Sequence, residues 1–151
     1  MDDIDRALIQ ALRQDARASW AELGRSVGLS GPSVTERVAR LERDGVIIGY
    51  HAAVDPVALG RSVAALVGVH LSDTSDQDVV TRALAKVEEI EDCWFVAGDE
   101  SFLIKVRVAD VPALESTLSR LRAIRGVART RTTVVLSTKW EGRVAEDPAL
   151  S

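Results

Sequence analysis

Arginine and hydroxyl side chains recur at helical spacing in the stretch SGPSVTERVARLER, residues 30–43. On a helix of about 3.6 residues per turn, Val34, Val38 and Leu41 share one apolar face, and polar side chains occupy the opposite face and its flank. Guanidinium forks and short hydroxyls of this kind bind phosphates and the edges of bases in a DNA groove. The stretch therefore predicts a recognition helix, with the candidate DNA-binding residues Ser30, Gly31, Pro32, Ser33, Thr35, Glu36, Arg37, Arg40 and Arg43.

A second interpretation of the same helix requires no DNA. Glu36 and Arg40 stand four residues apart in the favourable order, and such a pair stabilises any solvent-exposed helix by about 0.2–0.5 kcal/mol. The Gly31-Pro32 start favours the first interpretation, because it leaves the helix N-terminus free of bulky side chains and would let a phosphate approach the backbone amides. The helix alone leaves both interpretations open.

Two further helices are expected before this one. Residues 2–19 place apolar side chains at helical spacing, and Asp2 or Asp3 can cap their start. In the stretch SWAEL, Ser19 and Glu22 have the types and spacing of a capping box. A second helix is therefore predicted to begin directly after Ser19.

A short turn with a glycine should join the second helix to the third. Gly28 can take the left-handed conformation that ends a helix, Ser30 can cap the next one, and Gly45 should stop it after about Asp44. Three helices with such a turn form a helix-turn-helix pattern, which we assign to residues 1–50 as a DNA-binding domain. The β-branched and aromatic stretch VIIGYHAAVD, residues 46–55, predicts a strand or wing, and residues 51–61 are assigned to this strand and a linker.

The second half of the chain mixes strand and helix patterns. Strands are expected at residues 62–71, 92–98, 102–108 and 127–138, and helices at residues 75–90 and from Asp110 to Gly126. This β-α-β-β-α-β order is typical of a ferredoxin-like domain, which we assign to residues 62–140. Residues 141–151 are left as a C-terminal tail. The predicted fold is α+β, a winged helix-turn-helix followed by a ferredoxin-like domain.

The charge of the chain is unusual for a protein that binds phosphates. The formal net charge is -4, and residues 1–50 contain seven arginines against eight acidic residues. No basic field therefore covers the whole predicted DNA-binding domain. We expect one copy to bind DNA weakly, and an oligomer that places several copies on one duplex to bind through effective concentration.

Several other classes of protein are disfavoured by what the sequence lacks. His51, His70 and Cys93 show no recognisable zinc spacing, so no metal site is expected. The sequence contains no phosphate loop, nucleophile elbow or HExxH motif, so we expect no enzyme and no cofactor. The start MDDIDRALIQ is not a signal peptide, and no apolar run approaches the length of a bilayer span. A cytoplasmic location without membrane contact is the expectation.

The motifs of residues 2–140 resemble those of the Lrp/AsnC family, the leucine-responsive or feast/famine transcription regulators. The resemblance is carried by Arg17 with Ser19, by Gly28-Leu29-Ser30, by the stretch from Val34 to Ile47, by Gly49-Tyr50, and by VAGDESFLIKVRV in the second half. It implies a homodimer formed largely through the sheets, often assembled to a tetramer or octamer. It also implies that an amino acid or related effector binds between the second domains and changes assembly or affinity for double-stranded DNA.

By position, the resemblance implies an effector site on two segments. One is the loop Gly98, Asp99, Glu100, Ser101 and Phe102, and the other is the last strand of a neighbouring copy near Thr130, Thr132 and Thr133. The family often has an aspartate directly before the aromatic residue, where this chain has Ser101, so Asp99 or Glu100 would have to receive an effector's ammonium group. On its own the loop is also compatible with a plain β-hairpin turn.

Two rival functions remain open from the sequence. The chain is compatible with an effector-independent architectural protein that binds DNA through oligomerisation alone. It is also compatible with a small-molecule-binding or enzymatic ferredoxin-like domain that carries an incidental helical cap.

Overall fold

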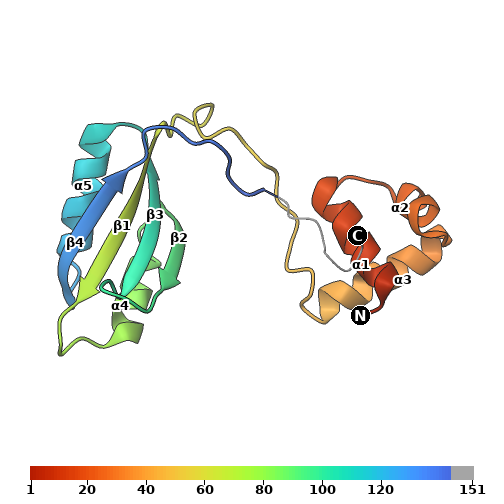
Figure 1. The fold of residues 1–151 in the computed structure, drawn as a ribbon, viewed down its shortest axis with the longest axis horizontal. Coiled ribbons are helices and arrows are strands. Elements are labelled where there is room, and N and C mark those ends of the chain that lie inside the picture. The colour runs from red at the N-terminus through yellow and green to blue at the C-terminus, as the bar shows by residue number, and fades with distance from the viewer. Residues whose placement is uncertain (144–151) are drawn as a thin grey trace. The chain divides into compact units, whose positions relative to one another are not determined.

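The computed structural model describes residues 1–143, which form two compact units (Figure 1). The first unit comprises residues 1–53 with residues 140–143, and the second comprises residues 54–139. Most of the predicted tail, from residue 144 onward, lies outside the described residues. Across residues 1–143, no helix combines the length and the apolarity that crossing a membrane requires.

The first unit consists of three helices that the sequence predicted. They are α1 (Asp3–Gln14), α2 (Trp20–Val27) and α3 (Gly31–Arg43). Asp2 caps α1, Ser19 and Glu22 form the expected capping box on α2, and Ser30 caps α3. The apolar faces of the helices meet in one core, whose buried members are Leu8, Leu12, Leu23, Val34 and Val38.

The turn between α2 and α3 depends on two glycines. Gly28 ends α2 with a φ of 71°, in the left-handed region that glycine adopts without strain. The N–H of Leu29 then donates to the carbonyl of Gly24 at 2.8 Å. A Cβ atom at Gly24 would lie 2.5 Å from the carbonyl oxygen of Leu29, so no other residue type fits there without moving the turn.

The strand or wing predicted for residues 46–55 is wrong for this chain, because these residues form turns and irregular backbone. The N–H groups of Val46 and Ile47 both donate back to the carbonyl of Leu41, at 2.9 and 3.1 Å. The hydroxyl of Tyr50 donates to Glu42 on α3 at 2.8 Å. A strand needs a neighbouring backbone to pair with, and the sheet found within residues 1–143 belongs entirely to the second unit.

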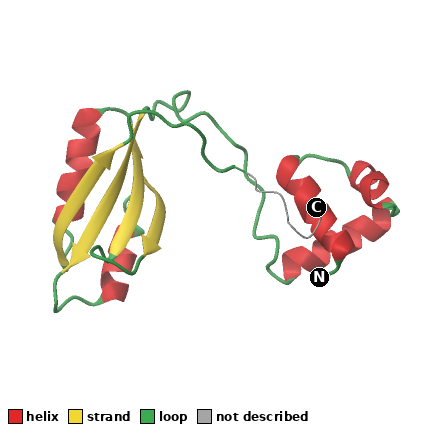
Figure 2. Cartoon of the chain, in the orientation of Figure 1, coloured by secondary structure: helices red, strands yellow, loops and turns green. Residues whose placement is uncertain are grey.

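The second unit has the predicted ferredoxin-like architecture (Figure 2). Its elements follow the order β1 (Val63–Leu71), α4 (Gln77–Leu84), β2 (Ile90–Phe95), β3 (Phe102–Val108), α5 (Val111–Arg122) and β4 (Val127–Val134). The four strands lie in the order β2-β3-β1-β4, and every neighbouring pair is antiparallel. This is the split βαβ arrangement.

Four elements end earlier than predicted, among them β2 at Phe95 instead of residue 98 and α5 at Arg122 instead of Gly126. For α4 and β4 the hydrogen bonds show why. After Leu84 the chain tightens into three-residue turns, with Val87 N–H donating to the Leu84 carbonyl at 3.0 Å and Ile90 N–H to the Val87 carbonyl at 3.1 Å. α4 therefore stops six residues before the predicted end. β4 stops at Val134 because its partner β1 starts at Val63, which leaves little backbone to pair with beyond that point.

The sheet has one face covered by helices and one face without them. On the covered face, β1 and β3 pack against α4 and α5, and the buried side chains are Ala65, Val67, Val69, Val80, Leu84, Phe102, Ile104, Val106, Val108, Leu114 and Leu121. The other face of β3 carries Lys105 and Arg107, as its alternation predicted. We call this second face the outer face of the sheet.

The core of the second unit gives a test of this packing. Leu121 on α5 is fully buried, so Leu121→Ala should lower the free energy of unfolding by about 2–5 kcal/mol. Val111→Ala on the same helix is the matched control, because Val111 is 66% exposed; it should cost less than about 0.5 kcal/mol. Urea denaturation followed by far-UV circular dichroism measures both, and equal losses would contradict the assigned packing.

Candidate nucleic-acid interface and ligand site

The N-terminus of α3 is built by short polar side chains. The hydroxyl of Ser30 accepts from the Ser33 N–H at 3.4 Å and lies 2.9 Å from the Ser33 hydroxyl. The hydroxyl of Thr35 donates back to the Gly31 carbonyl at 3.0 Å, while Pro32 occupies the first turn. The predicted residues at this end of the helix therefore lie together, and their small side chains leave the first turn open to approach.

The polar face of α3 lines an open groove of about 510 Å³. Val34, Val38 and Leu41 are buried behind it, as the apolar stripe predicted. The groove is lined by Leu29, Ser33, Glu36, Arg37, Ala39, Arg40 and Arg43. The structure thus brings together five of the candidate DNA-binding residues, Ser33, Glu36, Arg37, Arg40 and Arg43, around one concave surface.

Two of these arginines are held by carboxylates of α1. Arg37 Nη1 lies 2.7 Å from Asp2 Oδ2 and 2.8 Å from Asp5 Oδ1. Arg40 Nη2 lies 3.0 Å from Asp5 Oδ1 and 3.0 Å from Asp5 Oδ2. The Asp5 side chain is only 2% exposed. We call Asp2, Asp5, Arg37 and Arg40 the acid–arginine cluster.

The cluster changes the expected role of Arg40. The sequence allowed Arg40 to pair with Glu36 along the helix, whereas the structure pairs it with Asp5 across two helices. Asp2 and Asp5 were expected only as part of the α1 start, and nothing local in the sequence connects them to residues more than thirty positions away. Arg43 differs from both cluster arginines, since its side chain is 72% exposed and its nearest carboxylate, Asp44, lies 4.0 Å away.

The cluster also sets the protonation of its acids. Burial of Asp5 is the largest single influence and raises its pKa, but bonds from the Asp2 backbone and Arg37 with the charge of Arg40 outweigh it, so the pKa is lowered overall. The pKa of Asp2 is lowered by the backbone of Asp5 and then by Arg37. The pKa of Arg37 is raised by Asp2 and Asp5 in return.

Two residues of the predicted effector loop serve the sheet itself. The N–H of Ser101 donates to the Val69 carbonyl at 2.9 Å, and its hydroxyl accepts from the Leu71 N–H at 3.3 Å. Phe102 lies in the core, 2% exposed, with its ring edge-on to Phe95 at 5.2 Å between centroids. Ser101 therefore fastens the loop to β1, and Phe102 is buried under the helices rather than open to a ligand.

Glu100 is the loop acid that the fold positions most firmly. Its carboxylate lies 2.5 Å from Arg131 on β4, and its side chain is 16% exposed. A Cβ atom at Gly68 would lie 2.5 Å from Glu100 Cγ, so the glycine leaves room for the acid on the outer face of β1. Gly68 was not among the predicted site residues, although an isolated glycine inside a strand signals a close approach of this kind.

The loop and β4 place further charges and hydroxyls near this acid. Asp99 lies 3.5 Å from Arg129, and both are exposed. Thr130 and Thr132 pair with core residues of β1 and so face the helices, whereas Thr133 lies on the outer face. Of the three predicted threonines, Thr133 alone shares the face of Glu100.

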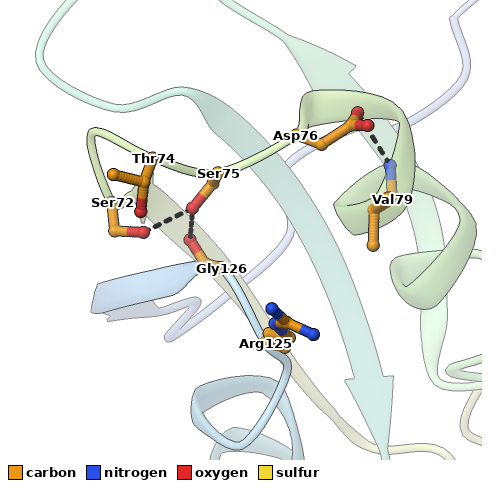
Figure 3. Close-up of a pocket in the computed structure, with 7 residues that line it drawn as sticks. All are labelled: Ser72, Thr74, Ser75, Asp76, Val79, Arg125 and Gly126. Atoms are coloured by element: carbon orange, nitrogen blue, oxygen red, sulfur yellow. Dashed lines mark hydrogen bonds between the residues drawn. The ribbon is translucent and has the colours of Figure 1, made fainter.

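A pocket of about 350 Å³ lies at the same end of the sheet, between the segment after β1 and the turn before β4 (Figure 3). The Ser72 and Ser75 hydroxyls lie within 2.5 Å of each other, and the Ser75 hydroxyl donates to the Gly126 carbonyl at 2.7 Å. Asp76 turns back to cap α4. The two serine hydroxyls and the Asp76 carboxylate are thus all engaged by neighbouring protein groups. The sequence did not predict this polar pocket.

Metal chemistry finds no support in the part of the chain that is described. Within residues 1–143, no three His, Cys, Asp or Glu side chains come together as metal ligands would. His70 lies in the sheet with Arg129 Nη2 3.4 Å from its Nδ1, and burial raises the pKa of the Cys93 thiol.

The lowered pKa values of Asp2 and Asp5 predict how the first unit responds to acid. Because the unfolded state binds protons more readily than the folded state, the contribution of these acids is complete above the unfolded pKa of about 3.9 and is lost as the pH falls below it. The Asp2→Asn/Asp5→Asn variant should therefore show a shallower fall in stability between about pH 5 and pH 2.

Urea denaturation at a series of pH values measures this slope. Asp3→Asn is the control, since it removes a carboxylate from the same turn that joins neither cluster arginine. A wild-type slope in the double variant would refute the assignment.

Comparison with known proteins agrees with both units. A family model of the AsnC-type helix-turn-helix domain matches residues 1–42, and a model of the Lrp/AsnC ligand binding domain matches residues 64–145. The regulator LrpA of Mycobacterium tuberculosis is 43% identical over 143 residues, covering 95% of each chain. The leucine-responsive regulatory protein of Escherichia coli is 40% identical over 141 residues, covering 90% of this chain and 85% of its own.

A solved structure extends the similarity to the whole fold. The feast or famine regulatory protein of M. tuberculosis, complexed with L-methionine, superposes with a TM-score of 0.91 at 42% identity, covering 97% of this chain and 99% of its own. The helix-turn-helix unit therefore corresponds to the first matched family model and the ferredoxin-like unit to the second, and they follow each other in that order along the chain. The chain belongs to the Lrp/AsnC family of transcriptional regulators.

Proposed function

We propose that this chain regulates transcription by binding double-stranded DNA through α3, and that an amino-acid-type effector bound to the second unit changes its DNA affinity or assembly. Residues 1–50 are the DNA-binding domain, residues 51–61 the linker, and residues 62–140 the effector-binding and oligomerisation domain. The observation that carries the proposal is the polar groove of α3, backed by a buried apolar stripe. The proposed function includes no catalytic step, and we place the protein in the cytoplasm.

Different residues of α3 would make different contacts with DNA. The first turn, from Ser30 to Thr35, suits a phosphate because it carries short hydroxyl side chains that leave room for close approach. Ser33, Glu36 and Arg40 line the groove and suit base edges. Arg43 is far more exposed than the cluster arginines and suits a phosphate.

An assembly of copies follows from the charge of the first unit. Seven arginines against eight acids in residues 1–50 give little attraction to phosphate, and two of those arginines already bind carboxylates. Apolar side chains without cover support contacts between copies, including Ile48 at 92% exposure and Leu136 at 97%. A homodimer that assembles further to a tetramer or octamer would supply several copies of α3.

The salt dependence of binding tests the role of Arg43. Arg43→Ala should reduce the slope of log affinity against log salt by about 0.9 per bound copy, because one phosphate contact is lost. Arg82→Ala on α4 is the matched control, since it removes an exposed arginine from the second unit. Fluorescence anisotropy with a labelled duplex across a salt series measures both slopes. An unchanged slope for Arg43→Ala would remove it from the interface.

The outer face of the sheet offers charges of both signs to an effector. Glu100 and Asp99 can accept from an ammonium group, and Arg131 and Arg129 can donate to a carboxylate. A free amino acid carries both groups. A relative that is 42% identical has been crystallised with L-methionine, which supports an effector of this class. The same acids are already paired with arginines, so an effector must share or replace these pairs.

A thermal-shift panel of the twenty amino acids tests the effector response. A ligand present at about one hundred times its Kd should stabilise the fold by about 2.7 kcal/mol. Gly68→Ala should abolish the shift, because the added Cβ would lie 2.5 Å from Glu100 Cγ and displace the acid. Glu100→Gln should weaken it through the loss of charge. Glu115→Gln, on the exposed side of α5, is the matched control.

The panel also separates the rival functions. If no amino acid shifts the wild-type melting temperature at millimolar concentration, the effector-independent architectural protein becomes the better description. If the chain also lacks any preference among DNA sequences, both DNA-binding functions fail, and a small-molecule-binding or enzymatic ferredoxin-like domain becomes the better description.

A further inference from the structure

The Asp5 carboxylate is fully used by its neighbours. Its Oδ1 accepts from Arg37 Nη1 at 2.8 Å and from Arg40 Nη2 at 3.0 Å. Its Oδ2 accepts from Arg40 Nη2 at 3.0 Å and from the Asp2 N–H at 3.1 Å. An ionised carboxylate offers about four acceptor sites, and these contacts occupy all of them. With the side chain 2% exposed, both arginines are held at a fixed place on α3.

The arginines retain free donors toward the groove. Each guanidinium has about five N–H groups, and the contacts above engage only Nη1 of Arg37 and Nη2 of Arg40. The Arg40 side chain is 46% exposed and lines the groove beside Ser33 and Glu36. Asp5 thus binds Arg40 through Nη2 and leaves the remaining N–H groups of this guanidinium available to a ligand.

The charges of the cluster nearly cancel. Asp2 and Asp5 face Arg37 and Arg40, so the group as a whole adds little to the attraction between the protein and the phosphate backbone. Its contribution to DNA binding must then lie in where the guanidinium donors point, which matters for base edges far more than for phosphates.

We infer that Asp5 is a positioning residue for sequence recognition: it holds Arg40, and with Asp2 it holds Arg37, so that α3 distinguishes one DNA sequence from another. The inference rests on the proposed DNA-binding function and assigns that function's specificity to an acid outside α3. The simpler alternative is that the cluster only fastens α1 to α3, and the two roles predict opposite results for DNA that lacks the preferred sequence.

Asp5→Asn is the informative variant, because asparagine keeps the shape and the oxygen that accepts from the Asp2 N–H while losing the charge. The DNA is a 30-base-pair duplex that the wild-type chain enriches from a random library, with a scrambled duplex beside it. We expect binding to the enriched duplex to weaken about tenfold, as the loss of one oriented arginine contact implies. Binding to the scrambled duplex should stay equal or tighten, because a negative charge is gone.

Asp3→Asn is the matched control for charge. It removes a carboxylate from the same helical turn without touching either cluster arginine, so both duplexes should be affected alike. A double-mutant cycle with Arg40→Ala separates the roles further. If Asp5 acts through Arg40, the double variant should lose little more than Arg40→Ala alone. If the losses of binding free energy in the two single variants add up to the loss in the double variant, the inference is overturned.

The outcomes for the inference and for the proposed function are distinct. If the wild-type chain shows no preference for the enriched duplex, the proposed function fails and the inference falls with it. If the wild-type chain shows the preference and Asp5→Asn keeps it, or weakens both duplexes equally with a lower melting temperature, only the inference is overturned. Should Asp5→Asn not fold, Asp2→Asn replaces it: Asp2 is 54% exposed, and a specificity ratio reduced about threefold is expected. An unchanged ratio overturns the inference.

Discussion

The buried carboxylate of Asp5 is the constraint on which the first unit depends. A charged group removed from water must be paired and fully hydrogen-bonded, or it destabilises the fold. Here two arginines of α3 and the backbone start of α1 satisfy it together. The orientation of α3 relative to α1 is therefore coupled to the placement of the arginine side chains that we propose contact DNA. Arginine suits this role better than lysine, because its planar fork can bind one group with one edge and present another edge to a ligand.

The second unit contains a similar acid–arginine pair at its own candidate site. Glu100 is largely buried against Gly68 and is held by Arg131 from the neighbouring strand β4. In both units a largely buried acid is paired with an arginine that remains partly exposed. Such a pair responds to an incoming charged ligand, since the ligand competes for donors that are already oriented. The two acids differ in burial: the Asp5 side chain is 2% exposed, whereas the Glu100 side chain is 16% exposed and lies on the outer face, where we propose that an effector binds.

Local signals in the sequence predicted most of the elements, because the interactions that start and stop helices lie within a few residues. The Ser19 capping box and the left-handed Gly28 are of this kind. Contacts between distant residues were missed for the opposite reason: Asp5 lies 32 residues from Arg37, and only the folded α1 and α3 bring them together. Gly68 had a visible signal in the sequence and Glu100 was named through the family resemblance, but the close approach of the two could not be predicted. The predicted wing was wrong because the strand propensity of residues 46–55 does not form a strand when no neighbouring backbone pairs with them.

The balance of charge then explains how the two units depend on each other in function. A domain with a formal net charge below zero, and with its two central arginines already paired, gains little from non-specific attraction to phosphate. Its contacts can be selective, but one copy cannot bind tightly. Under the proposed function, affinity comes from the number of copies held together, and we assign that role to the sheet of the second unit. Under the same proposal, a ligand bound at the outer face of the sheet would change DNA binding without touching α3, because it would change how many copies bind one duplex at once.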